Sequence, residues 1–217
     1  MVNFDGYLSI VFDCDGVILD SNSLKSDGFF HATQPYGEDL ARAFVEYHRS
    51  RGGVSRYAKF EYFLAELKPA ERPGPGYDEL LERYADYVSK GLRECAVAEG
   101  LADLAEQTKH SRWHIVSGGD QAELRTVMVE RGIEPYFSGG IFGSPDTKTE
   151  ILRREIANGN IRLPAIFLGD SRLDWEAAEA MNLDFIFLSD MTEFSEWRSW
   201  VNAEAIDHVP NLKALLA

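Results

Sequence analysis

Two aspartates separated by a single residue follow an apolar run near the start of the chain. Asp13 and Asp15 come directly after residues 7–12, which have the composition of a short buried strand. In parallel sheets the ligand crevice lies at the carboxyl ends of the strands. Two carboxylates there can both face the crevice, so that one attacks a substrate while the other handles protons. Taken alone, the segment could also be an acidic turn ended by Gly16.

Two later segments could bind an anion. Ser117, Gly118 and Gly119 follow the apolar run 113–116, and glycines after a strand let backbone amides approach an anion closely. Lys148 stands at the start of a helix predicted to run to about residue 157. A lysine there opposes the helix dipole, which suggests a role as a charge clamp. An ordinary turn and a surface lysine remain the alternatives.

A second pair of aspartates follows another apolar run, residues 165–168. Asp170 is well placed to bind a metal ion. Asp174 lies four residues further on, on the same face of the helix predicted to follow, and could hold metal-bound water or orient the loop. The alternative is a plain helix cap, since aspartate is favoured at helix starts.

The apolar runs alternate with amphipathic stretches, which predicts an α/β fold of the doubly wound, Rossmann-like kind with a parallel sheet. Strands are predicted at 7–12, 113–116, 165–168 and 185–188, and a weaker one at 140–142. All four chemical segments then lie at strand ends on one side of the sheet. Together they offer oxygen ligands for Mg²⁺, a carboxylate nucleophile, a lysine and amide donors, which are the groups that phosphoryl transfer requires.

About a hundred residues with almost no strand signal separate the first two strong strands, too many for a simple crossover. Helical spacing of apolar residues marks four segments there: 24–32, 38–49, 56–67 and 77–93. We therefore predict a core domain of residues 1–17 and 91–217 and an inserted helical cap domain of residues 18–90. Residues 97–107 read as the helix that returns to the sheet, and the chain from 192 onward as helix packed on the last strand.

The chain resembles the haloacid dehalogenase superfamily, in the subgroup of phosphoglycolate phosphatase and beta-phosphoglucomutase. Residues 12–21, FDCDGVILDS, closely match the first motif of that superfamily. Ser117, Lys148 and residues 169–174 resemble the second, third and fourth motifs. The predicted helical cap corresponds to the variable cap of the family.

The resemblance implies a role for each of these residues. Asp13 would be the nucleophile, and Asp15 would protonate the leaving alkoxide and later activate water. Mg²⁺ would be held by Asp13, by the backbone carbonyl of Asp15 and by Asp170, with Asp174 supporting the metal shell. The transferring phosphoryl group would be bound by Ser117, Gly118 and Lys148. Dehalogenases of the superfamily lack an acid at the position of Asp15, so its presence favours phosphate monoesters.

Two cap residues are candidates for substrate binding. Residues 51–56, RGGVSR, are similar to the substrate-specificity loop of beta-phosphoglucomutase, and Arg56 could clamp a second anionic group. A helix-turn-helix corner is the equal alternative. Lys25 stands where the mutases carry a catalytic histidine, which argues against mutase activity. His110 and His114 have the spacing of a metal pair on a helix, but His114 falls in a predicted strand, which argues against zinc.

The composition excludes several classes of partner. The chain has 217 residues, of which 45% are hydrophobic, and a net charge of -14. Nucleic acid and anionic membranes would be repelled by such a surface. Two distant cysteines, Cys14 and Cys95, make no disulfide framework, and neither a leader nor a membrane-spanning run is evident. We expect a cytoplasmic protein, and nothing in the sequence indicates its oligomeric state.

These observations predict a Mg²⁺-dependent phosphatase that hydrolyses a small phosphorylated metabolite, with a sugar phosphate as one candidate, through a phospho-aspartyl intermediate on Asp13. Two alternatives stay open. One is a sugar phosphomutase of the beta-phosphoglucomutase type. The other is a binding or regulatory relative that keeps the site with little turnover.

Overall fold

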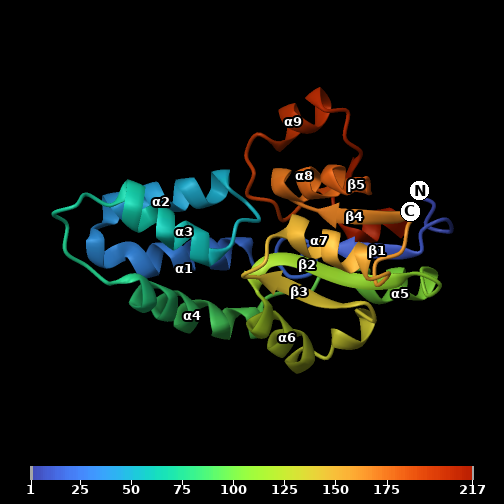
Figure 1. Ribbon diagram of the computed structural model, residues 1–217, viewed down its shortest axis with the longest axis horizontal. Helices are drawn as coiled ribbons and strands as arrows, with labels where there is room; N and C mark the ends of the chain where they lie inside the picture. The colour runs from blue at the N-terminus through green and yellow to red at the C-terminus, as the bar shows by residue number, and fades with distance from the viewer. Residues whose placement is uncertain (1, 217) are drawn as a thin grey trace.

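A six-stranded parallel sheet forms the centre of the protein (Figure 1). The computed structural model describes residues 2–216. The strand order is β3-β2-β1-β4-β5-β6, so β1 lies between β2 and β4, where the direction of winding reverses. The strands are β1 (Ser9–Phe12), β2 (Arg112–Asp120), β3 (Gly140–Ser144), β4 (Ala165–Gly169), β5 (Asp184–Leu188) and β6 (His208–Val209). This order confirms the predicted doubly wound α/β class and makes the carboxyl end of β1 the natural place for a ligand.

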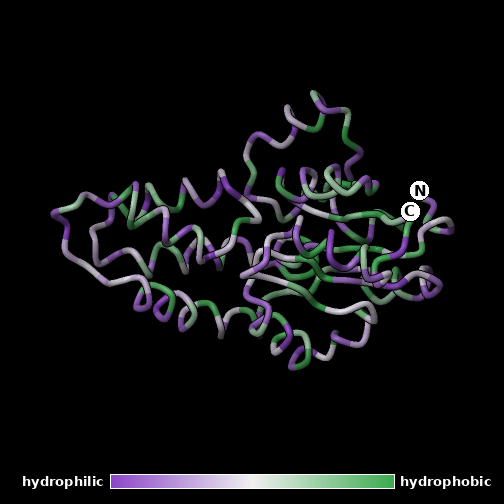
Figure 2. The backbone as a smooth tube through the Cα atoms, in the orientation of Figure 1, coloured by the Kyte–Doolittle hydropathy of each residue, from purple (hydrophilic) through white to green (hydrophobic). Residues whose placement is uncertain are grey.

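Helices cover both faces of the sheet. On one face, α5 (Leu101–Gln107) and α6 (Gln121–Glu130) contribute to the larger apolar core, together with the 3₁₀ turn η4 (Leu212–Leu216). On the other face, α7 (Lys148–Ala157) and α8 (Arg172–Ala180) pack over a second core. Side chains of β1 alternate between the two, as expected for a strand buried on both sides. The strands are accordingly hydrophobic in Figure 2.

A group of helices between β1 and β2 extends to one side of the sheet (Figure 1). The helices are α1 (Asn22–Thr33), α2 (Glu38–Ser50), α3 (Arg56–Tyr62) and α4 (Tyr77–Glu94), with the short turns η1 (Gln34–Tyr36) and η2 (Phe63–Leu67). We call residues 22–94 the helical insertion. Its interior is largely aromatic, with ring contacts among Phe29, Phe44, Phe60 and Tyr84. The four predicted helical segments are therefore confirmed. The domain boundaries at 17/18 and 90/91 stay a prediction; the last helix of the insertion, α4, ends at Glu94.

Two elements have a boundary four residues away from the predicted one. The strand predicted at 113–116 extends to Asp120, so the serine and glycines lie within β2 and not after it. A Cβ added to Gly143 of β3 would lie 2.3 Å from the carbonyl oxygen of Gly119, so glycine at position 143 permits this close approach across an irregular pairing. The helix predicted from residue 97 begins only at Leu101, because Gly100 before it has a φ of +84°.

The end of the chain contains a strand that the sequence pattern did not predict. The region from residue 192 forms α9 (Trp197–Ala203), but β6 then pairs in parallel with β5 before η4. A strand of two residues is too short to show a period, so only the tertiary structure could place it. Within residues 2–216, no helix is both long and apolar enough to cross a membrane.

Candidate active site

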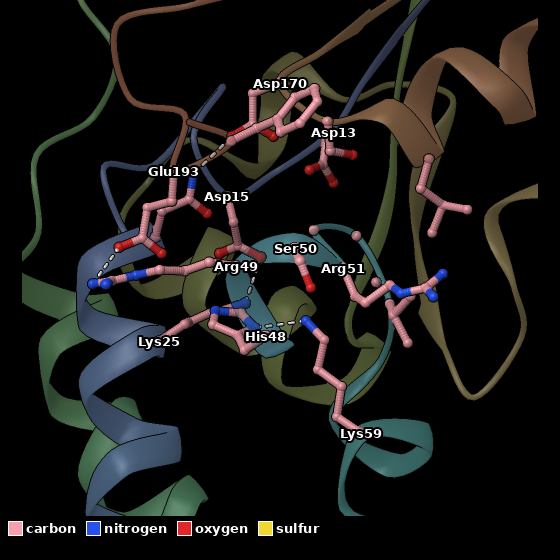
Figure 3. Close-up of a pocket in the computed structure, with 18 of the residues that line it drawn as sticks. Asp13, Asp15, Lys25, His48, Arg49, Ser50, Arg51, Lys59, Asp170 and Glu193 are labelled. Carbon is pink, nitrogen blue, oxygen red and sulfur yellow. Dashed lines mark hydrogen bonds and ion pairs between the residues drawn. The ribbon is translucent and has the colours of Figure 1, made fainter. Parts of the chain in front are cut away.

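A cavity of about 160 Å³ lies between the carboxyl edge of the sheet and the helical insertion. Core residues and insertion residues face each other across it (Figure 3). The core side includes Asp13, Asp15, Gly118, Asp170 and Ser171, and the insertion side includes Lys25, His48, Arg51, Arg56 and Lys59. The site is thus acidic where the strands end and basic where the helices cover it.

Asp13 is held rigidly at the end of β1. Its backbone amide donates to the carbonyl oxygen of Leu168 at 2.9 Å, which continues the pairing of β1 with β4 past the last strand residue. Its Oδ1 lies 2.9 Å from Lys148 Nζ, but not in the direction of a hydrogen bond, so this buried oxygen has a charge beside it and no hydrogen-bond donor among the described residues. Burial, offset in part by Lys148, raises the pKa of Asp13 to about 7.

Lys148 is buried against two carboxylates. A capping box of Thr147 and Glu150 starts α7 at this position. The Lys148 ammonium donates to Asp174 and lies beside Asp13. Burial lowers the pKa of Lys148, but the charges of Asp13 and Asp174 outweigh it and hold the pKa above its ordinary value. Lys148 is therefore charged, and it joins the end of β1 to the start of α8.

Asp13, Asp170 and Asp174 form a compact acidic cluster. Each offers a carboxylate oxygen within 4.8 Å of the others, and all three are buried. Burial, followed by the charges of Asp13 and Asp174, raises the pKa of Asp170 well above its ordinary value. Three carboxylates with one lysine leave a deficit of two positive charges in a buried place, which a divalent cation would balance. The all-oxygen donor set and the oxygen of Asp13 that lacks a donor fit Mg²⁺.

Asp174 is already engaged within this cluster. Its Oδ1 accepts from Lys148, and its Oδ2 accepts from the backbone amide and the hydroxyl of Ser171 at 3.1 and 2.6 Å. The bond from the Ser171 amide, together with the reciprocal bond from the Asp174 amide to the Ser171 hydroxyl at 3.3 Å, forms the capping box that opens α8. Asp174 therefore fixes both Lys148 and the loop that carries Asp170.

Asp15 lies at the cavity beside a lysine of the insertion. Its Oδ1 accepts from the Ser21 hydroxyl at 2.6 Å, and its Oδ2 pairs with Lys25. Burial raises the pKa of Asp15, but the charge and hydrogen bonds of Lys25 and the Ser21 hydroxyl outweigh burial and lower the pKa below its ordinary value. The sequence proposed Lys25 as a substrate contact; in the structure it lies against Asp15.

Only two of the three residues in segment 117–119 line the cavity. Gly118 and Gly119 line it, whereas Ser117 is fully buried beneath, where its Oγ accepts from the amide of Gly119 at 3.0 Å. A Cβ added to Gly118 would lie 2.1 Å from the carbonyl oxygen of Gly53, in the glycine loop of the insertion. Only glycine at 118 lets that loop sit directly over the sheet edge.

Arg56 joins the insertion to the core. Its guanidinium pairs with Glu123 in the first turn of α6 and lies 4.8 Å above the ring of Tyr84. The adjacent Tyr57 hydroxyl donates to Asp120 at 2.7 Å. Although Arg56 lines the cavity, its charge is matched by a protein carboxylate, and its predicted role in substrate binding stays a prediction.

Several residues around the site had not been singled out from the sequence. Asn22 donates to Asp170 Oδ2 at 2.7 Å and to the carbonyl oxygen of Met191 at 2.9 Å, so it joins α1 to two core loops. His48 and Lys59, from α2 and α3, line the cavity and contact each other. Asn22 falls just after the motif at 12–21 and could have been noticed there. His48 and Lys59 are ordinary polar residues of amphipathic helices and carry no such signal.

Comparison with solved structures places this arrangement among known folds. A predicted phosphatase from Clostridium acetobutylicum has 21% identity over 97% of each chain with a TM-score of 0.75. A beta-phosphoglucomutase from Clostridium difficile has 16% identity over 95% of this chain and 92% of its own, with a TM-score of 0.71. A predicted phosphoglycolate phosphatase from Haemophilus somnus has 16% identity over 86% and 87%, with a TM-score of 0.66. At these identities the likeness establishes the fold.

The family of the chain is established by comparing its sequence with known families. No curated protein matches the chain. The family model of haloacid dehalogenase-like hydrolases matches residues 10–188, which include the end of β1, the acidic cluster and the whole helical insertion. The chain is therefore a member of the haloacid dehalogenase-like hydrolase family, with a helical insertion between β1 and β2.

Proposed function

We propose that the protein is a Mg²⁺-dependent phosphatase that hydrolyses a small phosphate monoester through a phosphorylated Asp13. The observation that supports this most is the placement of Asp13 at the strand end beside a buried lysine and two further carboxylates. A nucleophile for phosphorus needs a charged oxygen, and the phosphoryl group it receives needs cations around it. Lys148 supplies one positive charge, and the acidic cluster suits a divalent cation.

In the first half of the proposed reaction, an oxygen of Asp13 attacks phosphorus in line with the ester bond. A bond forms between Asp13 and phosphorus, and the bond from phosphorus to the ester oxygen breaks. The leaving oxygen takes the electron pair and a proton from Asp15. Lys25 and the Ser21 hydroxyl, which both contact Asp15, stabilise the carboxylate that remains after this proton transfer.

In the second half, water attacks the phosphorus of the aspartyl phosphate. Asp15 takes the proton from water, and the bond between Asp13 and phosphorus breaks to release inorganic phosphate. Asp15 is available as this base because Lys25 and Ser21 outweigh burial and hold its pKa below the ordinary value, which keeps the carboxylate ionised. The proton that it takes restores the acid used in the first half. Lys148 holds the phosphoryl oxygens while Asp174 fixes the lysine.

Asp13, Asp170 and the backbone carbonyl of Asp15 would hold Mg²⁺, with Asp174 behind them. When bound, the ion supplies positive charge to the phosphoryl oxygens and keeps Asp13 ionised. Asn22 orients Asp170 from the insertion side through its hydrogen bond. The site would therefore combine ligands from the core with one orienting residue of the helical insertion.

The glycine contact between the insertion and the core supports a closed reaction chamber. With the loop of Gly53 against Gly118, water is kept from the aspartyl phosphate until the leaving group departs. The cavity of about 160 Å³ is below the roughly 300 to 1,000 Å³ typical of sites for drug-sized ligands, which favours a compact substrate. Two of the structural neighbours, a predicted phosphoglycolate phosphatase and a beta-phosphoglucomutase, also carry names that refer to small phosphorylated compounds.

A panel of phosphate esters tests the proposal. Purified protein should release phosphate from one or more small esters with Mg²⁺, and chelation of the metal should abolish release. The same panel should contain hexose phosphates analysed for isomers. Phosphate release supports hydrolysis; isomer formation without free phosphate would establish a phosphomutase instead. No reaction with any ester would favour a binding or regulatory role.

A further inference from the structure

Lys59 differs from every other buried cation of the protein. Within residues 2–216, four lysine and arginine side chains are buried: Lys25, Arg56, Lys59 and Lys148. Each of the other three pairs with at least one carboxylate, namely Asp15, Glu123, or Asp13 with Asp174. Lys59 is 1% exposed, lines the cavity, and has no ion-pair partner in the described part of the chain. A buried ammonium without an anion is costly, so its position calls for an explanation.

Lys59 contacts two uncharged rings, and its Nζ lies 5.4 Å from the centroid of the Phe29 ring. The other ring is that of His48. The Nζ of Lys59 lies 2.6 Å from Nδ1 of His48, a contact drawn in Figure 3. Burial first, and then the charge of Lys59, lower the pKa of His48 well below its ordinary value, so the imidazole is uncharged and accepts the hydrogen bond. Burial, followed by the charge of Lys25, also lowers the pKa of Lys59 to about 7. An anion placed beside this amine would oppose both effects and hold the amine in its charged form.

The two carboxylates whose charges act on Lys59, Asp15 and Glu193, are already engaged. Asp15 accepts from Ser21 and pairs with Lys25. Glu193, on the core loop after β5, accepts from the Ser26 hydroxyl and pairs with Arg49 at 3.3 Å. Neither carboxylate is free to move to Lys59 without breaking these contacts. The anion that matches Lys59 must then come from outside the chain.

Two arginines of the insertion line the cavity together with Lys59. Arg51 lies in the loop between α2 and α3, is exposed and has no ion pair among the described residues (Figure 3). Arg49 is paired with Glu46 and Glu193. This basic wall faces the acidic cluster of the core across a small cavity, in a protein whose net charge is -14. A molecule with a phosphate at one end and a second acid at the other would match both sides.

We propose that Lys59 and His48 bind a second acidic group, a carboxylate or a phosphate, of a substrate whose reacting phosphoryl group lies at Asp13. The proposal rests on the proposed phosphatase function and narrows its substrate class to small phosphorylated acids. Lys59 donates to an oxygen of the second acid, and His48 holds the ammonium in place. Because the cavity is small, we expect only a few carbon atoms between the two acidic groups.

Binding of three matched phosphonates tests this. Their carbon–phosphorus bond is not an ester, so binding is measured without turnover. The three are 2-carboxyethylphosphonate, ethane-1,2-bisphosphonate and propylphosphonate, which place a carboxylate, a phosphonate or a methyl group at the same distance. Each is titrated calorimetrically, with saturating Mg²⁺, into the unaltered protein, Lys59→Met and Lys90→Met. Lys90 is exposed on α4 and is the matched control for the loss of one positive charge from the insertion.

The unaltered protein should bind at least one acidic phosphonate about 10- to 100-fold more tightly than propylphosphonate, as a charge-assisted hydrogen bond implies. Whichever of the two acidic phosphonates binds more tightly shows whether the second acidic group of the substrate is a carboxylate or a phosphate. Lys59→Met should remove the preference and leave propylphosphonate binding unchanged, and Lys90→Met should keep it. Lys59→Gln, which retains a polar group, should give an intermediate preference, and melting temperatures establish that each variant is folded.

Equal binding of the three phosphonates, no binding of any, or a preference that survives in Lys59→Met would overturn the proposal. These outcomes are separable from a failure of the phosphatase assignment. If the protein hydrolyses ethyl phosphate but does not prefer acidic phosphonates, only the Lys59 proposal is wrong. If it prefers acidic phosphonates but releases no phosphate from any ester, the Lys59 proposal holds and the phosphatase proposal is wrong.

Discussion

The carbonyl oxygen of Gly53 occupies the space where a side chain at Gly118 would begin, 2.1 Å from the position of an added Cβ. Gly53 belongs to the helical insertion and Gly118 to β2 of the core. This contact is backbone against backbone, so no flexible side chain can move aside to relieve it. The closed position of the insertion therefore depends on the absence of a side chain at residue 118.

Gly118→Ala should hold the insertion away from the sheet edge. Overpacking of this size costs about 1 to 3 kcal/mol, so kcat/KM for ester hydrolysis should fall about 10- to 100-fold. Gly6→Ala is the control, because a Cβ there would meet nothing within 4 Å. Steady-state kinetics on both variants give the comparison. Unchanged kinetics in Gly118→Ala would mean that closure at this contact is not needed.

The pair of Arg56 and Glu123 should contribute strongly to the attachment of the insertion. Both side chains are largely buried, so removing either one leaves an uncompensated charge and should cost about 3 to 5 kcal/mol of unfolding free energy. Because they share one interaction, Arg56→Met with Glu123→Gln together should cost clearly less than the sum. Denaturant unfolding of the two single variants and the double variant measures this coupling.

Arg42 and Glu38 provide the matched control, since they form an exposed pair on α2. Their coupling should stay below about 1 kcal/mol. If Arg56 instead binds substrate, as the sequence suggested, Arg56→Met would raise KM for the natural substrate, spare a small generic ester and leave the unfolding free energy nearly unchanged. That pattern would contradict the attachment role.

Mg²⁺ should stabilise the folded protein through the acidic cluster. At a concentration of about 100 times its Kd, a ligand specific for the folded state adds about 2.7 kcal/mol to the unfolding free energy. Asp170→Asn should lose this gain, and without metal it should be more stable than the unaltered protein, because it relieves repulsion among three buried carboxylates. Asp103→Asn, an exposed change on α5, should leave both quantities unaltered. Equal stabilisation of Asp170→Asn by Mg²⁺ would place the ion elsewhere.

His114 should make the fold sensitive to mild acid. It is buried in β2, where its Nε2 lies 3.2 Å from the carbonyl oxygen of Asn160, and burial lowers its pKa from 6.5 to about 4. As pH falls from 6.5 to 4, the unfolded chain gains a proton that the folded one does not, so stability decreases. Between pH 7 and pH 5 this amounts to about 2 kcal/mol. His114→Phe should remove that part of the pH dependence in urea unfolding; an identical pH dependence would refute the assignment.

Sequence reasoning identified most of the core side of the site but, on the insertion side, only Lys25 and Arg56 among the residues that line the cavity, for a physical reason. Carboxyl ends of parallel strands meet at one edge, so residues 13, 148 and 170 could be expected together once the strands were recognised. In the structure Lys148 does lie at Asp13, and Asp170 lies in the same cluster. Strand β6 and the last residues of β2 were not predicted, because they form by pairing with neighbouring strands and have no hydrophobic period of their own.

The partners of the insertion residues could not be derived in the same way. Arg56 meets Glu123 and Lys25 meets Asp15 only because the insertion docks in one particular orientation on the core. Nothing in the spacing of an amphipathic helix specifies that orientation. That Lys59 has no ion-pair partner in the described part of the chain can be seen only from the three-dimensional positions of the other charged side chains. It could therefore not be inferred from the sequence.

The most direct test of the proposed chemistry is the covalent state of Asp13 during turnover. The protein is mixed with Mg²⁺ and its best ester, quenched in acid within one turnover, digested and analysed by mass spectrometry. The peptide that contains Asp13 should carry one phosphoryl group, located on Asp13, and Asp13→Asn should show neither this label nor phosphate release, a loss of about 10⁴-fold or more. Phosphate release with no label on Asp13, or at an equal rate in Asp13→Asn, would contradict the account.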